Sequence, residues 1–340
     1  MKKQLLFTLF VAVISATLSA QKCDYRAIAQ AAIDTTEKYL YNPAVLKTKE
    51  WSEFKTRVLD LSVNMTDDNE FRKMFVSNGS TLPFTHFGMM INAPSQNNSA
   101  SASQQESRPE KFRIRRMDTE TVLFTVKTFS ASAEEINPYL DTLKSMSFSN
   151  LIIDLRDNRG GTIASALPLA SYLVNDTLNG GAFLTQKYFA THSEVPKAES
   201  FINLPHFSEA SFSQIIKGIH TQEGLCLVVY PAEKTFQGKL YILTNRNTAS
   251  TCEPLVYGLK SAKRAVVVGE TTMGAMLNGE RFTINDRFSL FLPTADFYAA
   301  DGQRLDRVGV EPDVKVDPAD TLQKTMEIIN SKSNCQSSDN

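Results

Sequence analysis

The sequence predicts an α/β protein in which a small helical cap precedes a core of alternating strands and helices. In residues 24–78, apolar side chains such as Phe54 and Val58 recur at three- and four-residue steps, a spacing typical of helices that bury one face. Further along the chain, short runs rich in β-branched and aromatic residues alternate with helical segments. This alternation indicates crossover connections and a sheet that helices cover on both faces.

The N-terminus has the pattern of an export signal. Lys2 and Lys3 precede the apolar run of residues 5–14, which is too short to span a bilayer as a helix. Residues 18–20, Leu-Ser-Ala, resemble a cleavage site for a signal peptidase. We therefore expect residues 1–20 to be a signal peptide. The mature chain is expected to be exported to the periplasm or the extracellular space and to have no membrane span.

Changes in composition divide the rest of the chain. Residues 21–90 form the predicted helical cap, and residues 95–110, mainly Ser, Asn, Gln and Ala, are predicted to be a flexible polar loop. This loop lies near the start of the α/β core, residues 91–320, and residues 321–340 are expected to be a C-terminal helix with a flexible tail. Residues 175–235 show weak periodicity and are not assigned. The predicted strands are 122–126, 151–155, 240–243 and 265–268, the predicted helices are 133–146, 163–173 and 252–259, and a hairpin joins 282–284 to 288–292.

Charge and cysteine content bear on the class of protein. The 36 basic and 37 acidic side chains are balanced, whereas a nucleic-acid-binding protein needs a basic surplus. The four histidines are scattered and no cysteine spacing matches a zinc site, so neither a metal nor another cofactor is predicted. Export would permit disulfides, and a bridge could join the two ends of the folded region. The four cysteines, which allow three complete pairings, are Cys23, Cys226, Cys252 and Cys335.

Polar residues and paired glycines follow the predicted strand of residues 151–155. The segment runs Asp154-Leu155-Arg156-Asp157-Asn158-Arg159-Gly160-Gly161 and precedes a helix. Glycines allow a sharp turn that exposes amide hydrogens, and amides at a helix start attract negative charge. Such a turn can form an oxyanion hole, although a plain turn has the same composition. Arg156 and Asn158 are expected to pin the loop by hydrogen bonds.

A serine stands at a second turn between a strand and a helix. The segment is Asn247-Thr248-Ala249-Ser250-Thr251-Cys252-Glu253, and the strand of residues 240–243 leads into it. Such a turn can hold a nucleophilic Ser250 exposed, with the amide of Thr251 available to an oxyanion. The alternative is a simple helix cap, for which Ser and Thr are favoured. Glu253 is expected to serve the start of the helix.

Four segments, in this order, carry a resemblance to a known family. After the two turns come Gly269-Glu270-Thr271-Thr272-Met273-Gly274-Ala275 and residues 302–313, which end Gly309-Val310-Glu311-Pro312-Asp313. Over about residues 120–318, the chain resembles the serine peptidases that include the C-terminal (tail-specific) processing proteases, the tricorn protease core and the interphotoreceptor retinoid-binding proteins. The resemblance implies a superhelix of repeated strand-strand-helix units, as in crotonase and the Clp protease.

The resemblance also implies a serine nucleophile with one of two bases. In the processing proteases the base is a lysine 25 residues after the nucleophile, but Ala275 occupies that position here. The tricorn-like branch uses a histidine preceded by a hydroxyl residue, and Thr85-His86 lies at the corresponding place. That branch orients its histidine with an acid, usually Glu, where this chain has the shorter Asp306. The family's peptide-binding PDZ domain is expected to be absent.

The resemblance therefore predicts a serine peptidase that acts on peptides or unfolded proteins and needs no cofactor. An esterase would share the whole mechanism. A carrier of lipid or peptide ligands is the other alternative, because the retinoid-binding members bind apolar ligands on this fold. A carrier has no need to keep a serine, a histidine and an acid together. The implied catalytic residues are Ser250, His86, Asp306 and Thr85, and the implied oxyanion amides are those of Gly161 and Thr251.

Overall fold

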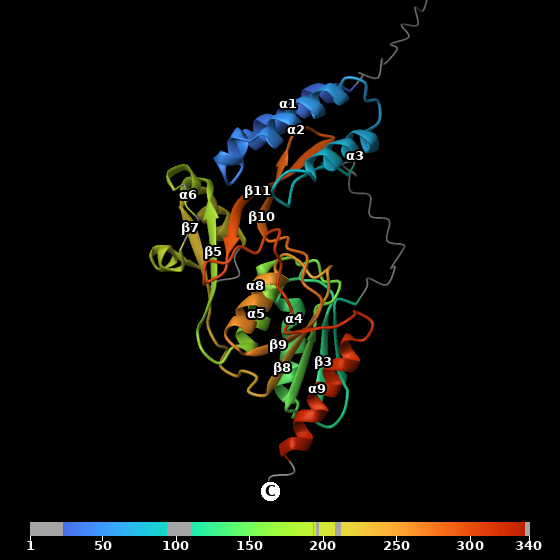
Figure 1. Ribbon diagram of the computed structural model, residues 1–340, viewed down its shortest axis with the longest axis vertical. Coiled ribbons are helices and arrows are strands. Elements are labelled where there is room, and N and C mark those ends of the chain that lie inside the picture. Colours follow the sequence, from blue (N-terminus) through green and yellow to red (C-terminus); the bar gives the residue numbers. More distant parts are fainter. Residues whose placement is uncertain (1–22, 94–109, 193, 195–196, 208–211, 337–340) are drawn as a thin grey trace, which may run out of the picture.

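The computed structural model describes residues 23–93, 110–192, 194, 197–207 and 212–336 as two sheets with helices on their faces (Figure 1). The expected signal peptide, the expected polar loop apart from residue 110, and the last four residues of the expected tail lie outside the described residues.

Three helices form the cap, where the apolar spacing predicts them. They are α1 (Tyr25–Tyr39), α2 (Lys49–Ser62) and α3 (Asp68–Gly79), with a short 3₁₀ helix, η1 (Pro43–Lys47), after the first. A side-chain oxygen of the residue before each α-helix accepts a backbone N–H of its first turn, which satisfies a donor that the helix cannot. The capping residues are Asp24, Thr48 and Asp67.

The cap packs on the first sheet and shares its hydrophobic core. Trp51, Phe71 and Phe75 are fully buried in one cluster with Phe288 and Leu290 of the sheet. The strands of this sheet, in spatial order, are β1 (Gly88–Ile91), β11 (Phe288–Tyr298), β5 (Leu178–Thr185), β7 (Gly224–Val229) and β6 (His206–Phe207), and β10 (Leu277–Thr283) pairs with β11. The antiparallel pair of β10 and β11 confirms the predicted hairpin.

The second sheet contains the parallel strands that the alternating pattern predicts. Its order is β12 (Val314–Lys315), β9 (Ala265–Gly269), β8 (Lys239–Thr244), β4 (Asn150–Asp154), β3 (Thr121–Val126) and β2 (Phe112–Arg116), and only β2 runs antiparallel to its neighbour. Helices α4 (Ala133–Ser145), α5 (Ile163–Leu173) and α8 (Cys252–Ser261) pack on one face. Helix α9 (Thr321–Gln336) packs on the other face. The expectation of a sheet covered on both faces is confirmed.

The unassigned stretch of residues 175–235 supplies three of the six strands of the first sheet. It contains β5, α6 (Gln186–Thr191), the 3₁₀ helix η2 (Ala198–Asn203), β6, α7 (Phe212–Thr221) and β7. Strand β5 contains Gly180 and Gly181, and its pairing with β7 shifts register there. Strand β7 is buried along its whole length, so its sequence shows no alternation. A broken strand and a uniformly apolar strand lack the period on which sequence assignment depends.

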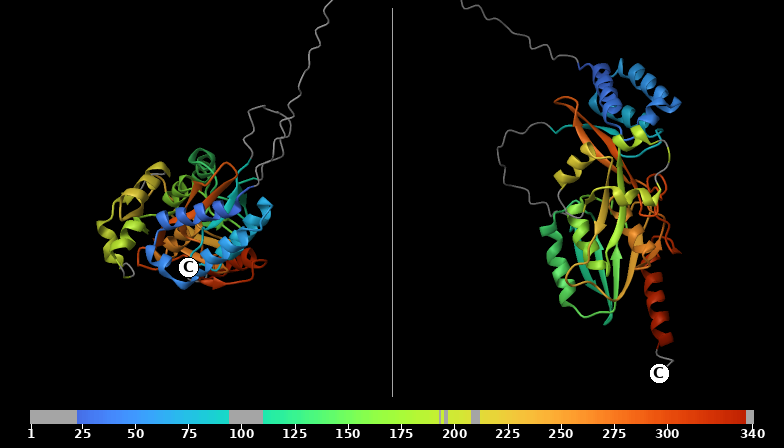
Figure 2. Two further views of the ribbon diagram at one scale, coloured as in Figure 1. Left: turned by 90° about the horizontal axis from the view of Figure 1, so that it is seen from above. Right: turned by 90° about the vertical axis from the view of Figure 1, so that its left-hand side faces the viewer.

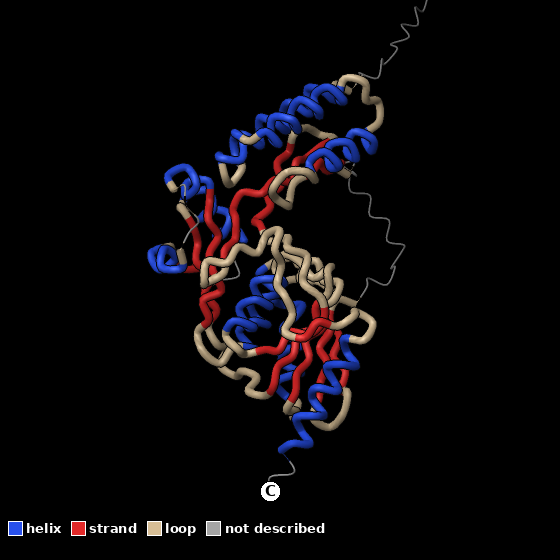
Figure 3. The backbone as a smooth tube through the Cα atoms, in the orientation of Figure 1, coloured by secondary structure: helices blue, strands red, loops and turns tan. Residues whose placement is uncertain are grey.

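The loops that follow the parallel strands gather at the edge of the second sheet that faces the first sheet (Figure 3). The carboxyl ends of parallel strands meet at one edge, which is where open α/β sheets bind ligands. The turn after β4 contains the glycine pair, and the turn after β8 contains Ser250. These two turns therefore lie together beneath β10 and β11 (Figure 1).

The cap and α9 lie at opposite ends of the molecule (Figure 2). Cys23, which precedes α1, is a free thiol, as are Cys226 and Cys252, and the side chain of Cys335 lies outside the described residues. Cys252 is fully buried, as a small core side chain would be. Within the described ranges, no helix is long and apolar enough to cross a membrane, and no group of three or more His, Cys, Asp or Glu side chains is placed to hold a metal ion.

Candidate active site

Ser250 stands on a strained turn between β8 and α8. Its φ of 56° lies in the left-handed region, which a serine adopts only when its surroundings enforce it. Two hydrogen bonds hold the turn: the Ser250 amide donates to Glu253 Oε2 at 3.0 Å, and the Ala249 amide donates to the Asn158 carbonyl at 3.0 Å. The half-buried serine is thus presented at a sharp strand-to-helix bend, as the sequence predicts.

The paired glycines pass so close to this turn that no side chain fits. Gly160 has a φ of 88°, and a Cβ placed on it would lie 2.7 Å from Ser250 Cβ. Gly161 has a φ of 147°, and its Cβ would lie 2.1 Å from the carbonyl carbon of Phe129. Glycine is therefore required at both positions, for conformation and for space.

Two amides beside Ser250 are available to a ligand. The Gly161 carbonyl accepts the Thr251 hydroxyl at 2.8 Å, which joins the two turns. Among the described residues, the N–H groups of Gly161 and Thr251 donate no hydrogen bond to a protein group, whereas those of their neighbours Gly160 and Thr162 do. Both residues line the same pocket as Ser250. Free amides in such a place can stabilise a negatively charged oxygen.

His86 comes from the segment between α3 and β1. Its φ is 58°, and the Arg307 guanidinium fixes the segment by donating to the carbonyls of Leu82 at 2.8 Å and Phe84 at 2.9 Å. Burial lowers the pKa of His86, and the nearby Asp306 carboxylate opposes that decrease. A ring with a lowered pKa is neutral at neutral pH, which is the form that can accept a proton.

The Thr85 hydroxyl connects the His86 ring to Asp306. Thr85 Oγ1 lies 2.8 Å from His86 Nδ1 and donates to Asp306 Oδ1 at 2.5 Å. Because the hydroxyl proton points to the carboxylate, the Thr85 oxygen accepts from Nδ1–H, which leaves a lone pair on Nε2. The expected relay of histidine and acid therefore includes the hydroxyl as a bridge, and no direct hydrogen bond joins His86 to Asp306 among the described residues.

His86 and Ser250 line one pocket together with Gly161 and Thr251. In the part of the chain that the structure describes, no hydrogen bond links the Ser250 hydroxyl to the His86 ring. Catalytic hydrogen bonds are often long before a substrate binds, so this separation is compatible with a base role. No lysine is among the described residues that line the pocket. Lys260, one of the nearest lysines in sequence, instead pairs with Asp313 at 3.4 Å.

Glu253 does more than begin a helix, and the sequence analysis missed this role. Its fully buried carboxylate accepts the Ser250 amide, the Thr272 hydroxyl at 2.6 Å, and the amides of Gly274 at 2.7 Å and Ala275 at 2.8 Å. Burial raises its pKa, although these hydrogen bonds favour the ionised form. Glu253 thus ties the turn of Ser250 to the third motif. The bond to the Ser250 amide is local, but local sequence offers no signal for the other three partners, which lie 19 to 22 residues away.

Arg156 and Asn158 pin the first turn, as predicted. The Arg156 guanidinium forms two hydrogen bonds of 2.8 Å with the Asp154 carboxylate and a third of 2.9 Å with the Pro318 carbonyl. Asn158 is fully buried, donates to the Val126 carbonyl at 2.9 Å and accepts the Gly160 amide at 2.9 Å. These contacts hold the glycine pair in place and leave neither side chain free for chemistry.

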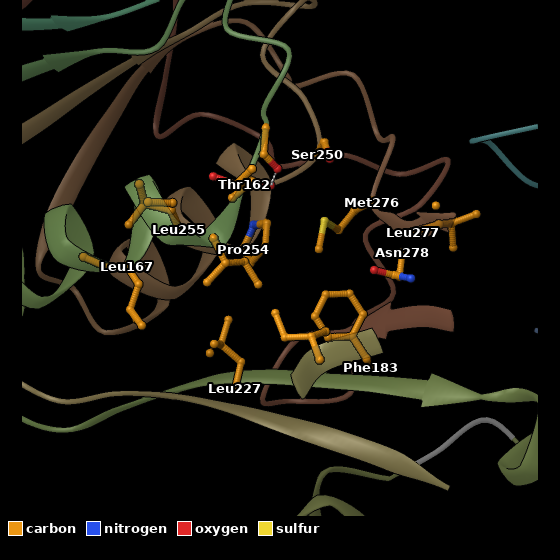
Figure 4. A pocket seen from close by; sticks show the side chains of 18 of the residues that line it. Thr162, Leu167, Phe183, Leu227, Ser250, Pro254, Leu255, Met276, Leu277 and Asn278 are labelled. Atoms are coloured by element: carbon orange, nitrogen blue, oxygen red, sulfur yellow. Dashed lines mark hydrogen bonds between the residues drawn. The ribbon is translucent and has the colours of Figure 1, made fainter. Parts of the chain in front are cut away.

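An apolar pocket of about 200 Å³ opens beside Ser250 (Figure 4). Its walls come from α5 and α8 on one side and from β5, β7, β10 and β11 on the other, so it lies between the two sheets. Leu167, Phe183 and Leu227 surround its interior, and Ser250 and Thr162 lie at one side (Figure 4). Apart from His86, none of the described residues that line it has an ionisable side chain. The pocket can therefore hold one apolar group next to the serine hydroxyl.

Comparisons with known proteins agree with this architecture. The profile of the family described as "Peptidase family S41" matches residues 120–316, more than half of the chain. The chloroplastic C-terminal processing peptidase of Tetradesmus obliquus is 26% identical over 176 residues, which are 52% of this chain and 30% of that protein. The carboxy-terminal processing protease CtpA of Bacillus subtilis is 23% identical over 196 residues, 57% of this chain and 34% of that protein. This chain thus spans about a third of the length of these curated relatives.

Solved structures share the fold at low sequence identity. A lipoprotein from Streptococcus agalactiae has a TM-score of 0.59 and 18% identity, with 96% of this chain and 100% of that chain covered. The tricorn protease has a TM-score of 0.55 and 12% identity, with 88% of this chain and 35% of that chain covered. The predicted fold class is confirmed: a mixed α/β fold like that of crotonase and the Clp protease, with an N-terminal helical region.

Proposed function

This chain belongs to peptidase family S41, and from that premise we propose that it is an exported serine peptidase whose nucleophile is Ser250. The export pattern of residues 1–20 supports the location. We place the chain in the branch with a histidine base, because Ala275 stands at the lysine position and no lysine lines the pocket. Ile91 ends β1 and Phe112 begins β2, which leaves too few residues for a PDZ domain between them.

The proposed reaction is acyl transfer in two halves. His86 Nε2 takes the proton of Ser250 as the serine oxygen attacks the scissile carbonyl. The oxyanion that forms accepts hydrogen bonds from the amides of Gly161 and Thr251. The imidazolium then protonates the leaving amine, which leaves an acyl-enzyme that water resolves by the same relay. Asp306 stabilises the imidazolium through the Thr85 hydroxyl.

One observation supports the proposal above the others. A serine on a left-handed turn, two amides without protein partners, and a His–Thr–Asp chain of hydrogen bonds meet at one pocket. Each group comes from a different segment, so the fold has to bring them together. A helix cap would explain Ser250 alone, but it would not explain the free amides or the neutral histidine.

The pocket indicates the class of substrate. Its apolar walls exclude a charged side chain, because such a group would lie there without a partner. At about 200 Å³ it is smaller than the 300–1,000 Å³ typical of pockets for whole drug-sized ligands. It therefore fits one aliphatic or aromatic side chain better than an entire lipid. We propose that this is the side chain of the residue before the scissile bond.

Hydrolysis of fluorogenic peptides that vary at this residue tests the proposal. We expect cleavage after Leu, Met or Phe and none after Asp or Lys. Ser250→Ala should lose on the order of 10⁶-fold in kcat while it unfolds at the same temperature as the wild type. Leu167→Trp should narrow the pocket and shift the preference toward Ala, and cleavage after Ala is the internal control for an intact site. Equal cleavage of all peptides by wild type and variant would show that the pocket does not bind the side chain before the scissile bond.

The same substrates separate the two alternatives. An esterase would hydrolyse matched p-nitrophenyl esters but no peptide, because an ester has a better leaving group. A carrier would hydrolyse neither and would not react with a serine-directed probe. The small volume of the pocket and the complete Ser, His and Asp set favour the enzyme over a carrier.

A further inference from the structure

Two buried carboxylates and one guanidinium lie behind the Thr85–His86 pair. Arg304 Nε donates to Asp296 Oδ2 at 2.7 Å, and Arg304 Nη2 lies 3.4 Å from Asp306 Oδ2. Asp306 is fully buried, and Asp296 is 2% exposed. Two ionised carboxylates in such a place are unfavourable unless a cation lies between them. Arg304 supplies that cation.

The contacts of Asp306 are divided between its two oxygens. Oδ1 accepts the Thr85 hydroxyl at 2.5 Å and the Met276 amide at 3.2 Å. Oδ2 faces Arg304. Rotation of the carboxylate would break the contacts of both oxygens. Arg304, which contacts Oδ2, therefore also orients Oδ1 toward Thr85.

Arg304 also joins the cap to this cluster. Its Nη2 donates to the Tyr41 hydroxyl at 3.1 Å, and Tyr41 belongs to the segment between α1 and η1. The Tyr41 amide donates to the Pro293 carbonyl of β11 at 3.2 Å, so the tyrosine is fixed at its backbone as well. A planar guanidinium presents five N–H donors in a fixed fork, whereas the three donors of an ammonium share one atom at the end of a flexible chain.

We propose that Arg304 is a positioning residue that holds the Asp306 carboxylate toward Thr85, with Asp296 and Tyr41 as its other anchors. The proposal rests on the proposed function, since it concerns the same relay. Arg304 is not placed to touch a substrate, because it does not line the pocket of Ser250. Its action is exerted through Asp306, Thr85 and His86.

Removal of Arg304 should protonate the pair of acids. Burial raises the pKa of Asp296 to about 6, and Arg304 opposes that rise. Without the guanidinium, two buried carboxylates would face each other with no cation, and the proton they take up would be shared between them. With that proton between them, the two acids would carry less negative charge behind Thr85 and would stabilise an imidazolium at His86 less. The titratable and charged groups that face Asp306 are Arg304, Asp296, Tyr41, His86 and, through Asp296, Tyr298.

The first test compares the pH dependence of kcat in three variants. Arg304→Gln should lower kcat about 10²-fold, because the Asp306 carboxylate is no longer held toward Thr85, and should move the acidic limb of the profile to lower pH together with the pKa of His86. Arg304→Lys keeps the charge and should recover part of both losses. Asp306→Asn shows how far kcat falls when no carboxylate is present at this position. Arg264→Met is the matched control: Arg264 also lies partly buried and holds the carbonyls of Leu173, Phe236 and Gly238, away from the pocket.

The second test does not depend on activity. The chain has four histidines, so the ring signals of His86 can be assigned in NMR spectra by comparison with His86→Ala. In a Ser250→Ala background, Arg304→Gln should lower the pKa of His86, because less negative charge is then held behind Thr85 to raise it. Simple loss of a distant positive charge would instead raise that pKa or leave it unchanged.

The two tests together separate the proposals. If the wild type hydrolyses nothing while Arg304→Gln lowers the pKa of His86, the proposed function is wrong and the positioning role of Arg304 stands. If Arg304→Gln keeps the wild-type pH profile and the wild-type pKa of His86, and only its melting temperature falls, Arg304 is merely structural and the inference is overturned. Should Arg304→Gln fail to fold, the pKa of His86 is measured by NMR in Arg304→Lys and Asp296→Asn instead. A wild-type pKa of His86 in both variants overturns the inference.

Discussion

At the scale of single residues, the His86 ring reaches the Asp306 carboxylate only through the Thr85 hydroxyl. The sequence indicates that a hydroxyl precedes the histidine and that an acid lies near residue 306. It does not show that the Asp306 carboxylate makes no direct hydrogen bond to the His86 ring in the described structure. The bridge depends on a side-chain rotamer and on two segments 221 residues apart, neither of which a pattern can reveal.

We predict that the bridging oxygen at Thr85 is essential while its methyl group is not. Thr85→Val removes the oxygen and preserves the shape, so kcat should fall on the order of 10²-fold because the imidazole loses its fixed tautomer. Thr85→Ser keeps the oxygen and should stay within about tenfold of the wild type. Steady-state hydrolysis of one peptide by both variants is sufficient. Equal losses in the two variants would mean that packing, and not the hydroxyl, matters at this position.

At the scale of elements, the turns after β4 and β8 are held together by the Ala249 amide on the Asn158 carbonyl and by the Thr251 hydroxyl on the Gly161 carbonyl. Sequence patterns predict the strands and helices on either side, because buried parallel strands and one-sided helices have distinct periods. They also predict that the glycine pair and Ser250 end neighbouring strands. They do not predict Glu253 or Arg304 as supports, since the Arg304–Tyr41 contact joins residues 263 positions apart. Long-range contacts of this kind are set by the fold as a whole.

We predict that Gly160→Ala damages activity more than stability. Its Cβ would press on Ser250 Cβ, and alanine at a φ of 88° costs about 1 kcal/mol or more. The resulting shift of the serine should lower kcat by about 10²-fold. Gly258→Ala in α8 is the control, because its Cβ would meet only the flexible end of Leu178, and alanine favours a helix. Chemical denaturation and kcat of both variants decide the matter. Full activity in Gly160→Ala would contradict the close contact.

At the scale of the whole molecule, the site is assembled from the cap and the core. Thr85 and His86 follow the cap helices, whereas Ser250 and Asp306 belong to the α/β core. The cap also shares its hydrophobic cluster with β11, and β11 pairs with β5 of the same sheet. Separation of the cap would therefore expose apolar surface and dismantle the relay at the same time.

We predict that cap and core unfold in one cooperative step. Trp51 is the only tryptophan, is fully buried and lies in the cap, so its fluorescence reports the cap alone. Far-UV circular dichroism reports the helices and strands of the whole chain. The two transitions in urea should coincide. A fluorescence transition at distinctly lower urea would show that the cap is an independent unit, and that the relay can come apart while the core stays folded.

Ser250 is proposed to be a nucleophile that His86 activates. The most direct measurement is the rate at which a fluorophosphonate labels the protein between pH 4 and 9, with the modified residue located by peptide mass spectrometry. Burial lowers the pKa of His86, and only the neutral ring accepts the serine proton. The account predicts an adduct on Ser250 whose rate rises with pH through a value below about 6.5, and whose formation nearly stops in His86→Ala. No adduct, an adduct on another residue, or a pH dependence that His86→Ala leaves unchanged would contradict it.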